Sequence, residues 1–285
     1  MKKTEIFVLC IILLCITALS IIFVSCGKSA EVESTEVEIG YYIGTSGNEN
    51  EYEINPYAAR HPYDLDCFIS DGTDVIYEGD ENFSTRKGVD VSKWQGNVDW
   101  QKVKAAGYEF AFFRLGYRGY QAGALFVDNT FHQNMENAGK AGLDVGVYFF
   151  SQAISEEEAI EEAYFVLNEL ENYDVQLPIV YDPEYVYEDD SRTKDLSGEQ
   201  IMKNIKAFCD VIENAGYDTM LYASMYWEAK ILDMGELKDY TFWYADYADK
   251  PQTPYDFAFW QYSDTGSVDG IEGNVDLNIQ FIRKE

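Results

Sequence analysis

Apolar and polar positions repeat from about residue 87 onward in the order typical of strands that alternate with helices. Short apolar runs predict eight strands, at residues 88–92, 110–115, 144–150, 177–182, 220–223, 241–245, 257–262 and 275–281. Apolar residues at three- and four-residue spacing predict helices between the first six strands, at residues 99–106, 130–141, 155–170, 197–212 and 226–232. The last strands follow one another too closely for helices to fit between them.

Polar residues mark where two of these helices begin. Ser155 stands three residues before Glu158, and Ser197 stands three residues before Gln200. A serine followed at that spacing by Glu or Gln predicts a capping box, in which each side chain accepts a hydrogen bond from the other's backbone N–H.

The order of the elements predicts an α/β fold. Strands that are buried on both faces and separated by helices imply a parallel sheet, and eight such strands suggest a closed barrel. Residues 87–285 are fewer than the roughly 250 residues of a complete eightfold barrel. We therefore predict a modified TIM-like (β/α) barrel over residues 87–285, with eight strands and fewer than eight helices.

The first 25 residues predict a secretory signal. Lys2 and Lys3 precede an apolar stretch over residues 6–24, which ends just before Cys26. The end of this stretch resembles a bacterial lipobox, although Phe23 stands where an aliphatic residue is usual. The resemblance implies that Cys26 is lipidated. The alternative is an uncleaved signal anchor, because the stretch is long enough to span a bilayer; either reading predicts an extracytoplasmic protein tethered to a membrane.

Two further segments separate the signal from the barrel. Residues 26–53 are rich in polar and acidic residues and predict a disordered acidic tether. Residues 54–86 predict a short N-terminal extension, in which Asp71-Gly72 between two apolar runs indicates a hairpin.

Composition excludes several function classes. The formal net charge of −30 makes nucleic acid a poor partner. Outside the signal and Cys26, Cys67 and Cys209 are the remaining cysteines, and together with His61 and His132 they show no short metal-ligand spacing. We therefore expect no disulfide framework, no metal and no cofactor, and we expect a monomer.

Two carboxylates stand at the end of the fourth predicted strand, in the tripeptide Asp182-Pro183-Glu184. Residues two apart in a strand share a face and are separated by roughly 6.6 Å. That separation is close to what glycoside hydrolysis requires of its two carboxyl groups. Because each carboxylate favours protonation of the other, we expect the pKa of Glu184 to be raised.

Further acidic and aromatic residues should gather at the same mouth of the barrel, where active sites of this architecture lie. Asp90 is near the end of the first strand, and Asp276 belongs to the closing strand, which neighbours the first in a closed barrel. The predicted substrate-binding residues are Tyr148, Tyr222, Trp243, Asp246 and Trp260. Carboxylates beside aromatic rings are typical of a carbohydrate-cleaving site.

Five motifs in this order resemble those of the glycoside hydrolase family 25 lysozymes. They are Asp90–Gly96, Gly142–Phe150, Asp182–Glu184, Trp260–Ser263 and Gly270–Asn278, and the resemblance covers about residues 87–283. It implies a flattened barrel that cleaves the β-1,4 bond between N-acetylmuramic acid and N-acetylglucosamine in peptidoglycan. It also implies that Glu184 is the general acid, Asp182 its partner, and Asp90 and Asp276 the further acidic residues of the cleft. Pro183 departs from the family, where an aliphatic residue is commoner.

Several alternatives stay open. Asp182 could act as a nucleophile or could orient the substrate's own 2-acetamido group. Asp90 could be a turn residue, Asp276 a strand-end residue, and Asp246 an ion-pair partner of Arg114. The competing function is a non-catalytic peptidoglycan-binding lipoprotein on the same fold, which the presence of all four acidic positions argues against.

Overall fold

The computed structural model describes residues 38–43 and 49–284. The predicted signal at 1–25, the lipidation site Cys26 and much of the predicted tether lie outside the described residues. The described part of the tether contains β1 (Glu38–Ile43) and β2 (Glu49–Ile54), which pair antiparallel. In the described ranges, no helix has both the length and the apolar character needed to cross a bilayer.

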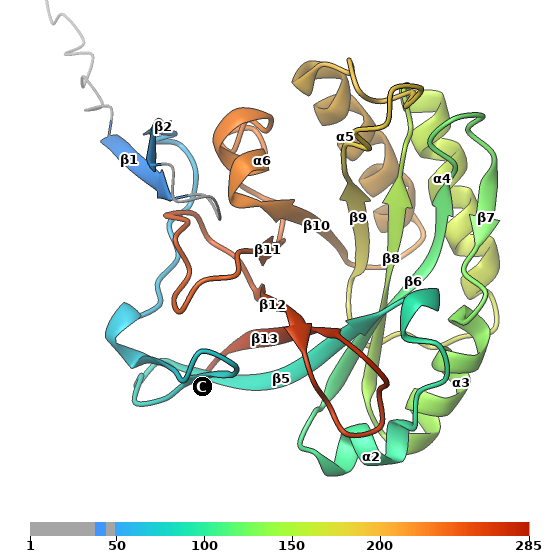
Figure 1. Ribbon diagram of the computed structural model, residues 1–285. Coiled ribbons are helices and arrows are strands. Elements are labelled where there is room, and N and C mark those ends of the chain that lie inside the picture. Colours follow the sequence, from blue (N-terminus) through green and yellow to red (C-terminus); the bar gives the residue numbers. More distant parts are fainter. Residues whose placement is uncertain (1–37, 44–48, 285) are drawn as a thin grey trace, which may run out of the picture. The chain divides into compact units, whose positions relative to one another are not determined.

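Eight strands close into a barrel, as the sequence predicts (Figure 1). Around the barrel they follow the order β5, β13, β12, β11, β10, β9, β8 and β6, and β6 pairs again with β5. Their bounds are β5 (Phe83–Val91), β6 (Phe110–Arg118), β8 (Asp144–Ser151), β9 (Ile179–Pro183), β10 (Thr219–Ser224), β11 (Phe242–Ala245), β12 (Phe259–Gly266) and β13 (Val275–Arg283). A short strand, β7 (Leu125–Val127), extends the sheet beside β6.

Five α-helices connect the first six barrel strands, and α3 and α4 lie along the outer side of β6 and β8 (Figure 1). Their bounds are α2 (Trp100–Ala105), α3 (Phe131–Ala141), α4 (Glu156–Leu170), α5 (Gly198–Asn214) and α6 (Met225–Lys230). Across residues 242–283, all of which the structure describes, no helix intervenes between β11, β12 and β13. The prediction of fewer than eight helices is confirmed.

The two predicted capping boxes form only in part. Ser155 accepts from the backbone N–H of Glu158, but the Glu158 carboxylate accepts from Ile154 instead of Ser155. Ser197 likewise accepts from the N–H of Gln200, whose side chain donates to a residue further along the helix. The serine half of each box is enough to begin the helix.

Strand β13 runs antiparallel to both of its neighbours, whereas every other barrel pairing is parallel. The short connection over residues 267–274 suits an antiparallel pairing with β12, because a parallel one would need a crossover of a dozen or more residues. As a result, the start of β13 lies at the same rim as the carboxyl ends of the parallel strands.

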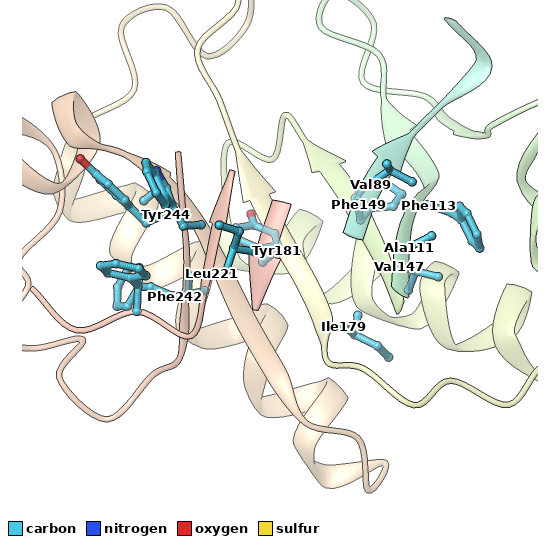
Figure 2. Packing of buried hydrophobic residues seen from close by; sticks show 14 of the residues in the cluster. Val89, Ala111, Phe113, Val147, Phe149, Ile179, Tyr181, Leu221, Phe242 and Tyr244 are labelled. Carbon is cyan, nitrogen blue, oxygen red and sulfur yellow. The ribbon is translucent and has the colours of Figure 1, made fainter. Parts of the chain in front are cut away.

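Side chains alternate between two cores. One set points outward from the strands toward the helices and includes Val89, Ala111, Phe113, Val147 and Phe149 (Figure 2). The alternate positions fill the barrel interior with Phe110, Phe112, Leu177, Val180, Met220, Trp243 and Phe259. The same alternation puts the polar residues at the strand ends on the inner face.

Two glycines make room for the interior aromatic rings. A Cβ atom on Gly88 would lie 2.2 Å from the ring of Phe110, and one on Gly146 would lie 2.4 Å from the ring of Phe112. The two large rings therefore occupy space that only glycine leaves on the neighbouring strands.

The segment before the barrel contains the predicted hairpin. Strands β3 (Phe68–Ser70) and β4 (Val75–Tyr77) pair antiparallel around Asp71-Gly72. The ring of Phe68 packs edge-on against Trp260 at 5.4 Å between ring centroids. The hairpin thereby covers one side of strand β12.

Candidate active site

Four carboxylates line one cavity of about 230 Å³ at the carboxyl end of the barrel: Asp90, Asp182, Glu184 and Asp276. Asp90 is near the end of β5, and Asp182 and Glu184 come from the end of β9 and just beyond it. Asp276 is directly opposite Asp90 in the β5–β13 pairing. The antiparallel direction of β13 explains how a residue at the start of a strand reaches this rim.

Asp90 is the most thoroughly bonded of the four. Its Oδ2 atom accepts from Gln261 Nε2 and from Asn278 Nδ2, each at 2.8 Å. Asn278 in turn accepts from the indole N–H of Trp243 at 2.7 Å, which fixes the orientation of its amide. Burial raises the pKa of Asp90, and the hydrogen bonds from Asn278, Gln261 and Asp276 oppose that rise.

Asp276 is held in its neutral form beside Asp90. Burial, the negative charge of Asp90 and their shared hydrogen bond raise the pKa of Asp276 to about 9. A protonated Asp276 can donate to an ionised Asp90, so the pair carries one negative charge instead of two.

The pKa values of Asp182 and Glu184 are raised as well. Burial is the main cause of the raised pKa of Glu184, and the charge of Asp90 adds to it. The expected rise therefore occurs, with burial contributing more than the neighbouring carboxylates. The pKa of Asp182 is raised well above its ordinary value, mainly by burial and to a smaller extent by the charges of Glu184 and Asp90. The positive charge of Arg114 opposes this rise. Oδ1 of Asp182 is buried without a hydrogen-bond partner among the described residues.

Arg114, the positively charged residue of the cavity lining, forms an ion pair with Asp128, which the sequence analysis did not predict. Arg114 donates to Asp128 from Nε at 2.9 Å and from Nη2 at 2.7 Å, and the Asp128 side chain is fully buried. The alternative in which Asp246 pairs with Arg114 is therefore wrong. Asp128 also accepts from the backbone N–H of Lys93, so it links Arg114 to the loop after β5.

Three of the five predicted substrate-binding residues line the cavity, namely Tyr148, Tyr222 and Trp243. Trp260 is fully buried and does not line it, and its indole N–H donates to the backbone carbonyl of Asp246 at 2.9 Å. The Asp246 carboxylate accepts from Tyr244 and Gln252 and also lies outside the cavity lining. These two residues support the loop after β11.

Two exposed aromatic residues at the cavity were not predicted. Trp94 is 76% exposed and Tyr247 is 45% exposed, and both line the cavity. Each follows the carboxyl end of a barrel strand by a few residues, which is the signal that could have identified them. Exposed rings beside buried carboxyl groups can stack on a sugar while a neutral carboxylic acid donates a proton to it.

Comparisons with known proteins agree with this geometry. The family model described as glycosyl hydrolases family 25 matches residues 89–271, which include Asp90, Asp182 and Glu184 and end before Asp276. The autolytic lysozyme of Clostridium acetobutylicum is 30% identical over 193 residues, which cover 67% of this chain and 55% of that protein. Lysozyme M1 of Streptomyces globisporus is 30% identical over 221 residues, which cover 73% of this chain and 71% of that protein. The crystal structure of the bacterial lysozyme from Streptomyces coelicolor superimposes with a TM-score of 0.56 at 29% identity, over 68% of this chain and 91% of that one.

Proposed function

This chain belongs to glycosyl hydrolases family 25, and on that premise we propose that it is a lysozyme. Its reaction is hydrolysis of the β-1,4 bond between N-acetylmuramic acid and N-acetylglucosamine in peptidoglycan. The observation that carries the proposal is the convergence of Asp90, Asp182, Glu184 and Asp276 on one cavity bordered by aromatic rings.

Glu184 is the general acid in this proposal. Its raised pKa favours the protonated form, and the proton passes to the oxygen of the leaving sugar as the glycosidic bond breaks. Positive charge then develops on the other sugar, and the single negative charge shared by Asp90 and Asp276 stabilises it.

Asp182 assists the departure of the leaving sugar by one of two routes. As a carboxylate it attacks the sugar as a nucleophile, or it orients the substrate's 2-acetamido group for the same attack. A water molecule that gives its proton to Glu184 then hydrolyses the intermediate of either route. The first route leaves a covalent adduct on Asp182, and the second leaves none. Mass spectrometry of the protein trapped with a slow substrate separates the two.

The substrate and the signal segment together suggest where the protein acts. We propose an extracytoplasmic monomer that is anchored in a membrane through lipid on Cys26 and faces the cell wall. The net negative charge of the chain is unfavourable for binding to nucleic acid.

The decisive experiment is mass analysis of the fragments released from purified peptidoglycan. A lysozyme leaves N-acetylmuramic acid at the new reducing ends. Reducing-end N-acetylglucosamine would instead indicate a glucosaminidase, and no release would indicate a wall-binding protein without activity; either result would contradict the proposal.

Glu184→Gln keeps the shape of the side chain and removes the transferable proton. Turnover should fall by roughly 10²–10⁴, the usual contribution of general acid catalysis. Binding to the insoluble wall should persist, because Tyr148, Tyr222 and Trp243 are unchanged. Glu188→Gln is the matched control, since Glu188 is an exposed glutamate of the following loop and should keep full activity.

A further inference from the structure

Gln152 is a buried polar residue directly after β8 that the proposed reaction does not use. Only 1% of its surface is exposed. Its Nε2 atom donates to two backbone carbonyls, that of Ser151 at 2.7 Å and that of Glu184 at 2.6 Å. Its Oε1 atom accepts from the hydroxyl of Thr193 at 2.8 Å. The side chain therefore joins the end of β8, the backbone of Glu184 and the loop that follows it.

These partners allow only one orientation of the Gln152 amide. Both carbonyls need a donor, and only the NH2 end supplies one. Turning the amide over would place its oxygen against two carbonyl oxygens and lose both hydrogen bonds. The Thr193 hydroxyl, which has Ser191 Oγ 3.3 Å away, donates to the amide oxygen and holds the correct orientation.

Ser151, the residue before Gln152, is fixed as well. Its Oγ atom donates at 2.6 Å to the carboxylate of Glu162, which is fully buried. Glu162 accepts in addition from Arg118 Nε at 2.7 Å. Gln152 is thus connected to a buried ion pair at one end and to the backbone of Glu184 at the other.

The position of Glu184 in the chain explains why such a bond matters. The pairing of β9 with β8 ends at Pro183, and its pairing with β10 ends earlier, at Tyr181. Pro183 has no N–H group to continue the ladder. Glu184 is therefore the first residue beyond the sheet, and the Gln152 side chain supplies a hydrogen bond that the sheet does not.

We infer that Gln152 is a positioning residue, which fixes the backbone of Glu184 and so aims its carboxyl group at the scissile bond. The inference rests on the proposed role of Glu184 as general acid. Thr193 contributes by setting the orientation of the Gln152 amide. A displacement of about 1 Å at an acid of this kind can lower the rate roughly 100-fold.

The test compares variants of the full chain on purified peptidoglycan. Gln152→Met keeps the length of the side chain and removes both donors, so we expect kcat to fall about 10- to 100-fold with little change in KM. The limb of the pH–rate profile that reports loss of the Glu184 proton should also shift. Thr193→Val should change kcat in the same direction by a smaller factor, and Thr193→Ser should restore it.

Coupling between the two residues provides a second readout. Because Thr193 acts through Gln152, the double variant Gln152→Met with Thr193→Val should be no slower than Gln152→Met alone. If Gln152→Met does not fold, the milder Thr193→Val and its Thr193→Ser rescue decide the question.

Asn204 offers a matched control. It is also 1% exposed, and its Nδ2 atom donates to the backbone carbonyl of Ala153 at 2.8 Å. Asn204→Leu removes a buried amide-to-carbonyl bond one residue away from Gln152 without touching Glu184. It should lower the thermal midpoint and leave kcat and the pH profile unchanged.

Two results would overturn the inference alone: a folded Gln152→Met enzyme with wild-type kcat and pH profile, or an equal loss of kcat in Asn204→Leu. In both cases Glu184→Gln would still show its large loss of turnover, so the proposed function would stand. An inactive wild type or a fully active Glu184→Gln would overturn the proposed function and the role of Gln152 with it.

Discussion

Replacing Asp276 by Asn tests whether the Asp276 carboxyl stays protonated in the folded protein and so makes the free energy of unfolding depend on pH. The neutral form of Asp276 donates a hydrogen bond to Asp90, and an asparagine amide can make the same bond. Asp276→Asn should therefore resemble the wild type at low pH and be more stable than it at high pH.

The magnitude follows from the two pKa values of the Asp276 carboxyl. Its ordinary value is 3.8, whereas burial and the charge of Asp90 raise the value in the folded protein to about 9. Between these values the folded state binds one more proton than the unfolded state, so the free energy of unfolding decreases as pH rises. One proton corresponds to about 1.4 kcal/mol per pH unit, or at most about 4 kcal/mol between pH 5 and pH 8.

Urea unfolding of wild type and Asp276→Asn at several pH values between 5 and 8 measures this difference. The free energy of unfolding of the variant should still decrease somewhat as pH rises, because burial also raises the pKa of Asp182 and Glu184. The exposed Glu272→Gln serves as the charge-matched control and should follow the wild type. Parallel curves for wild type and Asp276→Asn would show that Asp276 ionises normally, and would refute the shared-proton description of the pair.

Two further predictions concern packing and anchoring. Gly88→Ala should destabilise the barrel by about 1–3 kcal/mol in urea unfolding, since its Cβ would lie 2.2 Å from the Phe110 ring. The control Gly139→Ala on α3 places a Cβ with nothing within 4 Å and should be neutral or stabilising. Equal effects of the two substitutions would argue against this packing. Cys26→Ser should leave an unprocessed precursor that incorporates no labelled fatty acid, and equal labelling of wild type and variant would contradict the lipoprotein proposal.

Local sequence was sufficient to predict the strands and helices of the barrel and part of the candidate active site. The apolar periods predicted the eight barrel strands and the five helices, because side-chain periodicity is a property of each segment by itself. The hairpin around Asp71-Gly72 was predicted for the same reason. The convergence of Asp182 and Glu184 on one cavity also follows from the two-residue repeat of a strand.

The closed barrel further predicted that Asp90 and Asp276 would be close, and they are paired directly. The antiparallel direction of β13 was not predicted. Strand direction depends on which edge is free when the chain returns, and that is decided by the assembled sheet.

Contacts between distant segments decided the remaining features of the site. The hydrogen bonds from Gln261 and Asn278 to Asp90 join residues 171 and 188 positions apart. The sequence does not show which acidic residue pairs with Arg114. The folded structure brings Asp128, in the loop before α3, next to Arg114 on β6.

Burial was the property least accessible to sequence reasoning. Trp260 has the residue type of a sugar-stacking group, yet Phe68 from the N-terminal hairpin packs against it and it does not line the cavity. The raised pKa of Glu184 was expected from neighbouring charges, whereas burial is its larger cause. Sequence determines which side chains share a strand face, but the exclusion of water from a side chain depends on every segment that packs around it, and only the tertiary structure brings those segments together.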